Sequence, residues 1–137
     1  MTRRIQHDYS KPITFNNPGE IVIKAIDSIL MGQNDIISID HNDVSDLVTG
    51  SSKVVVSFGF GDTIKDAVRA SLNVISQGYK LYDTTKAIIQ FTSDKDERLE
   101  NFSFEEQLSL FPKNCNITYG LKVKEKAAPK VVLVVAR

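Results

Sequence analysis

The sequence predicts an α+β domain, a two-layer arrangement in which a mixed four-stranded sheet carries two helices packed on one face. Four short segments rich in β-branched residues have the composition of strands: 53–58, 86–92, 116–121 and 131–135. The segments that separate the first three of these strands have helical periodicity instead. Helices bury their apolar stripes best when they share one face of such a sheet.

A first helix precedes the sheet. Residues 1–16 are polar and lack a clear period, so we expect a tail or the remnant of an interdomain connection. Asn17 can cap a helix and Pro18 suits its first position. Apolar residues then recur at helical spacing as far as Leu30, and Gly32 ends the helix.

A second, short helix follows the apolar segment 36–39. Asp40 is the expected N-cap, because a short polar side chain stands directly before a helical pattern of apolar residues. Asp43 falls in the first turn of this helix. The run Gly50-Ser51-Ser52 ends it.

Two helices then alternate with the strands. A long helix is predicted from Thr63 to Gln77, with one narrow apolar stripe, and Gly78 closes it. A shorter helix begins with the capping-box pattern at 103–106 and ends before Pro112.

The last two strands are joined by the polar segment 122–130, which is too short for a helix, so we expect strands 116–121 and 131–135 to form a hairpin. The last strand is almost continuously apolar. Such a run predicts a central strand covered on both faces.

Composition excludes several classes of protein. Lys plus Arg equals Asp plus Glu at 17 each, which argues against a nucleic-acid partner. No apolar run approaches the roughly 20 residues of a membrane helix, and no apolar stretch follows Met1–Arg4 as in a secretory signal, so we expect a cytoplasmic protein. The single cysteine, Cys115, excludes an internal disulfide and favours a structural thiol.

Two further motifs have simple structural interpretations. Gly59-Phe60-Gly61 lies between a strand and a helix, but the third glycine of a dinucleotide-binding loop is missing, which favours a tight turn with close helix–strand packing. His41 lies between two aspartates, yet one histidine beside acids on an exposed loop is usually solvated, so no dedicated metal site is expected.

Several segments together resemble the C-terminal domain of the FtsZ/tubulin-like GTPases. Residues 37–44 resemble the synergy loop of FtsZ, whose pattern is Asn-x-Asp-x-x-Asp. Asp40 and Asp43 match its aspartates and Ser38 replaces its asparagine. The preceding helix is similar to the family's central helix. The glycine-rich strand end at 58–61 and the strands at 86–89, 116–120 and 131–136 are similar to further family segments in order and spacing, so the resemblance covers residues 17–137.

The resemblance implies a filament role. In the family this loop reaches over the GTP of the next subunit, so Asp40 and Asp43 would act as catalytic residues in trans, with Ser38 in place of the asparagine. Each carboxylate also suits plain helix capping, and the two roles are compatible. GTP and Mg²⁺ are implied for the parent protein, which would be a GTP hydrolase in cell division or another cytoskeletal process.

The isolated chain is not expected to be an enzyme, because no segment resembles the family's phosphate-cradling loop or a Walker motif. We expect an excised domain or a natural half-protein, monomeric alone, whose partner is the nucleotide-binding domain of the same or an adjacent subunit. The alternative is a free-standing interaction module that binds or caps an FtsZ-like filament. A small enzyme on a similar scaffold would need polar groups that converge on the sheet face, and the strands offer few.

Overall fold

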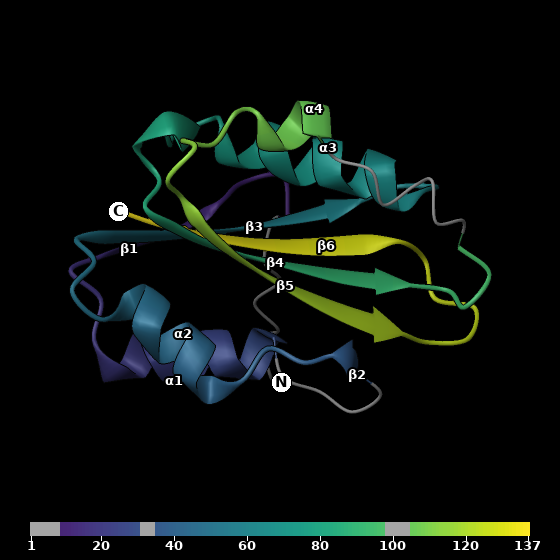
Figure 1. Ribbon diagram of the computed structural model, residues 1–137, viewed down its shortest axis with the longest axis horizontal. Coiled ribbons are helices and arrows are strands. Elements are labelled where there is room, and N and C mark those ends of the chain that lie inside the picture. Colours follow the sequence, from purple (N-terminus) through teal and green to yellow (C-terminus); the bar gives the residue numbers. More distant parts are fainter. Residues whose placement is uncertain (1–8, 31–34, 98–104) are drawn as a thin grey trace, which may run out of the picture.

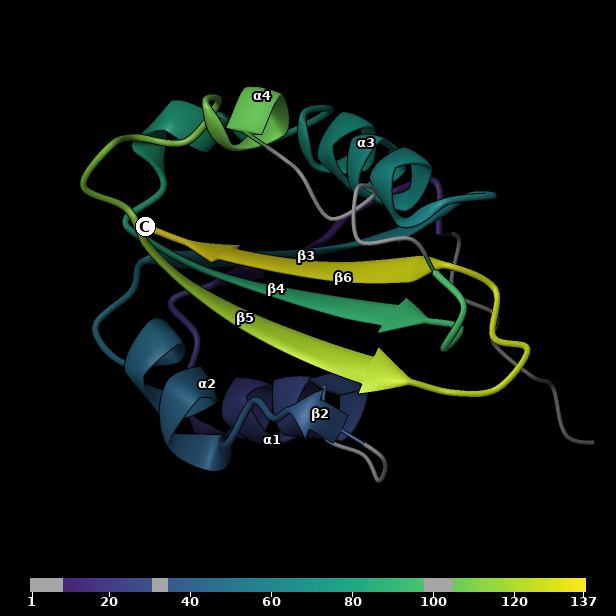
Figure 2. The same cartoon turned by 45° about the vertical axis from the view of Figure 1, so that its right-hand side comes forward.

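The computed structural model describes residues 9–30, 35–97 and 105–137. Within these residues the chain forms a twisted sheet with helices on both faces (Figures 1 and 2). The strands are β1 (Ile13–Asn16), β2 (Asp35–Ile37), β3 (Lys53–Phe60), β4 (Lys86–Ser93), β5 (Asn116–Val123) and β6 (Lys130–Ala136). The helices are α1 (Glu20–Leu30), α2 (His41–Val48), α3 (Ile64–Ile75) and α4 (Glu105–Leu108), with a 3-10 turn η1 at Leu81–Asp83. No helix in the described part is long and apolar enough to cross a membrane.

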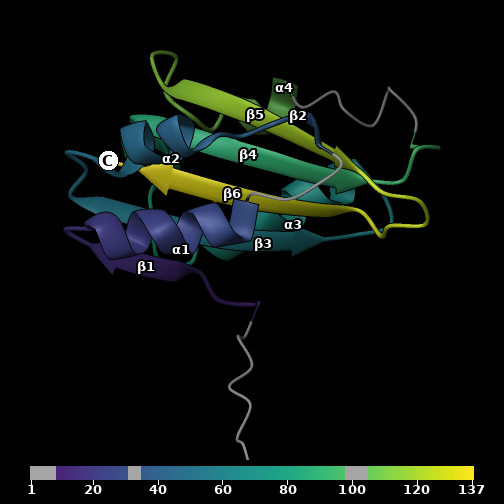
Figure 3. The same ribbon diagram turned by 90° about the horizontal axis from the view of Figure 1, so that it is seen from below.

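The α+β class and the mixed sheet are confirmed. The four predicted strands are present, and α3 and α4 pack together on one face as expected. Two short strands enlarge the sheet to the order β1-β3-β6-β4-β5-β2 within the described residues, and only β4 and β5 run parallel. The two preceding helices, α1 and α2, lie side by side under the opposite face (Figure 3), so the expected two layers become three.

The predicted hairpin between β5 and β6 is wrong. β6 pairs with β3 on one side and with β4 on the other, and β4 separates it from β5. The apolar pattern explains this placement, because Val131, Leu133 and Val135 face the α3 layer while Val132 and Val134 face the α1 layer. The central position predicted for this strand is therefore confirmed, and such a position requires a neighbour on each side.

The N-terminal expectations also need correction. Residues 13–16, which we expected in the tail, form β1 along β3. Asn17 does not cap α1. It has a left-handed φ of 49°, donates its backbone N–H to Ser52, and the helix begins three residues later at Glu20. The expected helix stop at Gly32 and capping box at 103–106 fall on or across residues outside the described ranges.

Close strand–helix packing explains the Gly-x-Gly motif, as expected. A Cβ at Gly59 would lie 1.9 Å from the carbonyl oxygen of Ala67, and one at Gly61 would lie 2.5 Å from the Cβ of Asp66. In the same region the Ser57 hydroxyl donates to the carbonyl of Ser71. Only glycine lets β3 approach α3 so closely.

A buried side-chain amide connects the C-terminal end of α1 to the sheet. Gln90, on β4, is almost fully buried and donates a 2.5 Å hydrogen bond from Nε2 to the carbonyl oxygen of Leu30. The last carbonyls of a helix lack intrahelical partners. Gln90 therefore supplies a donor to the C-terminus of α1 and fixes its distance from the sheet.

Candidate functional site at the start of helix α2

The loop that contains Ser38 and Asp40 is anchored to the edge of the sheet. β2 pairs with β5, and Ile37 is opposite Leu121. Ile39 is 2% exposed and packs directly against the backbone of Gly120. The loop therefore begins from a fixed strand and is held by one buried side chain immediately before Asp40.

Asp40 and Asp43 form a reciprocal capping box at the first turn of α2. Asp40 Oδ1 accepts a 2.9 Å hydrogen bond from the backbone N–H of Asp43, and Asp43 Oδ2 accepts a 3.0 Å bond from the N–H of Asp40. The predicted N-cap is confirmed, with Asp40 in extended conformation. The caps satisfy backbone donors that the first turn of a helix leaves open.

Each of the two carboxylates keeps one oxygen outside the cap. Asp40 is exposed and Asp43 is half-buried, and neither Asp40 Oδ2 nor Asp43 Oδ1 has a hydrogen-bond partner among the described residues. The cap fixes the orientation of both side chains. Two acceptor oxygens therefore remain at one helix terminus, where they can receive a water molecule or a hydrated cation.

His41 contributes an interaction that sequence reasoning missed. Its Nδ1 lies 2.7 Å from Oδ2 of Asp27 on α1, while 63% of the His41 side chain stays exposed. His41 is therefore tied to α1 rather than simply solvated. The other oxygen of Asp27, Oδ1, is buried and has no hydrogen-bond partner in the part of the chain that the structure describes. This pair links the two helices across 14 residues of sequence, a separation at which periodicity carries no signal.

Ser38 is exposed on the same loop, one residue before buried Ile39. No hydrogen bond connects Ser38 with Asp40 or Asp43 within the described residues. Ser38 is thus exposed on the loop that leads to Asp40, and it lies outside the capping network of the two acids.

A small polar cleft adjoins the site. Its volume is about 90 Å³, and it lies between α2 and the first residues of β4 and β5. The residues that line it are Asp43, Asp46, Leu47, Lys86, Ala87, Asn116 and Thr118. Lys86 Nζ donates to the carbonyl oxygen of Asp46, which connects the sheet to α2. Asp43 therefore lines the same cleft as the ammonium group of Lys86, which is already hydrogen-bonded to the backbone of α2.

Metal-ligating side chains are sparse in the part of the chain that the structure describes. Among the described residues, no three His, Cys, Asp or Glu side chains gather closely enough to hold a metal ion. Mg²⁺ and Ca²⁺ prefer six or more oxygen ligands. The two free carboxylate oxygens can instead orient a water molecule by accepting its hydrogen bonds.

Comparison with known proteins identifies the architecture. No protein-family model matches the chain, and none of the curated proteins matches it. Among solved structures, the chain is similar to the empty FtsZ dimer of M. jannaschii, with a TM-score of 0.65, 21% identity and coverage of 88% of this chain and 40% of that one. A tryptophan-to-tyrosine mutant of M. jannaschii FtsZ gives a TM-score of 0.66 and 23% identity, with coverage of 85% and 38%.

A third solved structure extends the similarity. The GDP-form protofilament structure of TubZ from Bacillus thuringiensis serovar israelensis matches with a TM-score of 0.59 and 8% identity, covering 85% of this chain and 34% of that one. The chain thus spans about two fifths or less of the length of the structures it matches. At these identities the similarity concerns the arrangement of the backbone. The chain has an FtsZ/tubulin-like fold.

Proposed function

We propose that this chain acts as the C-terminal domain of an FtsZ-like cytoskeletal GTPase, in which it provides longitudinal filament contacts and completes the GTPase site of the adjacent subunit. The supporting observation is the capping box, which orients one free oxygen each of Asp40 and Asp43 on an exposed helix terminus. Phosphoryl transfer is catalysed mainly by positioning and charge rather than by covalent steps. Two fixed carboxylates match that requirement.

The proposed mechanism assigns the residues of this chain separate tasks. Asp40 and Asp43 orient the attacking water. The pairing of β2 with β5 and the buried side chain of Ile39 fix the position of the loop relative to the sheet. The His41–Asp27 pair fixes the loop relative to α1. Bound GTP and Mg²⁺ would supply the reacting phosphoryl group and its charge neutralisation, and both would be held by the nucleotide-binding domain of a neighbouring subunit.

By itself the chain is proposed to be inactive and to have no GTP site. We expect a calorimetric titration of the chain with GTP and Mg²⁺ to give no saturable heat. Ser38 stands in place of an asparagine, whose longer side chain has its donor and its acceptor on separate atoms, so the loop is expected to work below the rate of a loop with asparagine.

A fusion experiment tests the proposed role. The chain is joined to the nucleotide-binding domain of an FtsZ-like protein, and GTP hydrolysis is compared with that of the nucleotide-binding domain alone and with the two parts mixed unfused. The proposal predicts assembly and GTP turnover that require the fused chain. Turnover by the nucleotide-binding domain alone at the rate of the fusion would contradict the proposal.

A further inference from the structure

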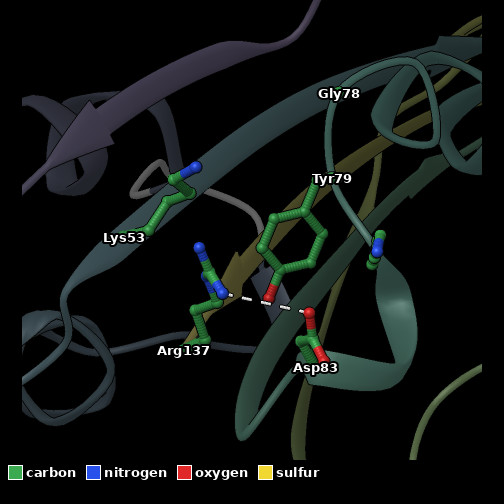
Figure 4. A pocket seen from close by; sticks show the side chains of 6 residues that line it. Lys53, Gly78, Tyr79, Asp83 and Arg137 are labelled. Carbon is green, nitrogen blue, oxygen red and sulfur yellow. Dashed lines mark ion pairs between the residues drawn. The ribbon is translucent and has the colours of Figure 1, made fainter.

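A second cavity lies at the end of the sheet where β3 begins and β6 ends. Its volume is about 260 Å³ (Figure 4). The lining residues are Lys53, Gly78, Tyr79, Lys80, Asp83 and Arg137. They come from the start of β3, the segment between α3 and η1, η1 itself, and the residue after β6. The fold therefore gathers three basic side chains from distant parts of the sequence around one cavity.

The charge of the lining is unbalanced. The side chains of Lys53, Lys80 and Arg137 contribute three positive charges and that of Asp83 one negative charge, which leaves a side-chain charge of +2; the α-carboxylate of Arg137 in the 137-residue chain lowers this to +1. The C-terminus of α3 lies just before Gly78, and its partial negative charge offsets part of this excess. A net positive field remains, because the helix terminus is equivalent to only about half an elementary charge.

The basic groups retain hydrogen-bonding capacity. Arg137 Nη1 lies 3.9 Å from Asp83 Oδ2, too far for a hydrogen bond, and the two side chains are 44% and 39% exposed. Lys80 Nζ lies 5.9 Å from the centre of the Tyr82 ring, and Lys53 Nζ has no acceptor within the described residues. The donors around the cavity are thus largely unused inside the domain.

Tyr79 adds a neutral donor to this lining. Only 7% of Tyr79 is exposed, and its hydroxyl oxygen accepts a 3.0 Å hydrogen bond from the Thr84 hydroxyl. The hydroxyl hydrogen of Tyr79 is then available to a group in the cavity. Burial raises the pKa of Tyr79 above its ordinary value, so this side chain stays protonated at neutral pH.

We propose that this cavity binds a phosphate group in its dianionic form, as inorganic phosphate or as a phosphomonoester. A guanidinium with two ammonium groups provides donors from several directions, as phosphate recognition requires. The site is separate from Asp40 and Asp43, and it does not depend on the function proposed for them.

The binding test uses the 137-residue chain and two probes. Inorganic phosphate and phosphoserine are titrated separately at pH 7.5 and constant ionic strength, while amide NMR shifts are followed. We expect saturable shifts at Lys53, Tyr79 and Lys80. Equal affinity for the two probes assigns the cavity to free phosphate, and tighter binding of phosphoserine assigns it to a phosphomonoester.

Variants separate a built site from general attraction to positive charge. Lys53→Gln and Arg137→Gln should each weaken binding about tenfold, since each removes a charge-assisted hydrogen bond. Asp83→Asn should strengthen binding severalfold by removing the acidic side chain of the lining. Lys124→Gln, an exposed lysine after the opposite end of β5, is the matched control and should leave the affinity unchanged. Shifts that do not saturate, or that Lys124→Gln reduces as much as Lys53→Gln, would overturn the proposal.

Discussion

Gly120 and Ile39 touch so closely that a Cβ on Gly120 would lie 2.6 Å from Cγ1 of Ile39. Ile39 is buried and immediately precedes Asp40, so this contact determines how near the acidic loop lies to β5. The backbone of Gly120 is in a strand, and its φ is not positive. Glycine is therefore required at this position because a larger side chain would overlap Ile39.

We predict that Gly120→Ala destabilises the domain by about 1–3 kcal/mol, because Ile39 must move out of a well-packed site. Ile39→Ala removes the obstructing atoms, so the double variant should show a favourable coupling between the two changes. Urea denaturation measures all four species. Gly19→Ala is the control, since nothing lies within 4 Å of a Cβ there. Additive effects of the two substitutions would show that the contact does not constrain the loop.

Gln90 provides a second prediction, about the position of α1. Gln90→Leu keeps the approximate size of the side chain but removes the donor to the carbonyl of Leu30, and we expect a loss of about 1–3 kcal/mol in the free energy of unfolding. Gln77→Leu removes an exposed hydrogen bond to Ser10 and should change stability by less than about 0.5 kcal/mol. Equal losses for the two variants would refute the special role of the buried amide.

Because Tyr79 is buried, we predict that the free energy of unfolding of the domain depends on pH in the alkaline range. Burial, the largest cause, raises the folded-state pKa of Tyr79 above the unfolded value. Its contribution to stability is therefore fully present below the unfolded pKa, near 10, and is lost as pH rises through the folded pKa. We expect the stability advantage of the parent over Tyr79→Phe, measured in urea, to shrink between pH 8 and pH 11.

Tyr82→Phe, at an exposed position, is the matched control for that series. The parent should also lose stability at high pH through Tyr119 and Cys115, whose pKa values burial likewise raises. An advantage over Tyr79→Phe that grows with pH would contradict the assignment of the shift to burial.

Local patterns in the sequence predict which segments form helices and strands, but they do not predict which of these elements lie next to one another in the fold. The β-branched run at 131–135 indicates a central strand, but the insertion of that strand between β3 and β4 depends on long-range pairing. Ile13–Asn16 is too short, and too close to Pro12, to be distinguished from a tail. Its strand character comes from pairing with β3.

In the candidate site, too, local contacts can be predicted from the sequence and long-range contacts cannot. Asp40 and Asp43 are three residues apart, so helix-capping chemistry predicts their contact. Asp27 and Gly120 are distant in sequence from the loop they hold, and a single sequence carries no signal that joins them. The lining of the phosphate cavity was missed for the same reason, since Lys53 and Arg137 meet only through β-sheet pairing.

Ser38 gives a companion prediction for the fusion protein. Ser38→Asn introduces an amide with both a donor and an acceptor beside the acids, and we expect GTP turnover to rise while the melting temperature stays within about 2 °C of the parent. A steady-state phosphate-release assay measures the rate. Unchanged turnover in an active fusion would show that the residue at this position does not limit the loop.

The central claim is that the acids at the start of α2 act on a neighbouring subunit's GTP, and Asp40→Asn in the fusion protein tests it most directly. Asparagine caps a helix about as well as aspartate but carries no charge, so capping and catalysis separate at this position. The measurement is GTP turnover per polymerised subunit, with filament mass followed by light scattering and stability by melting temperature. Asp40→Ala and Asp43→Ala, which lose the cap and about 1 kcal/mol of stability, accompany it. Our account predicts that Asp40→Asn melts and assembles like the parent but hydrolyses GTP roughly 100-fold more slowly. Turnover of Asp40→Asn at the parent's rate, with only the two alanine variants melting earlier, would contradict it.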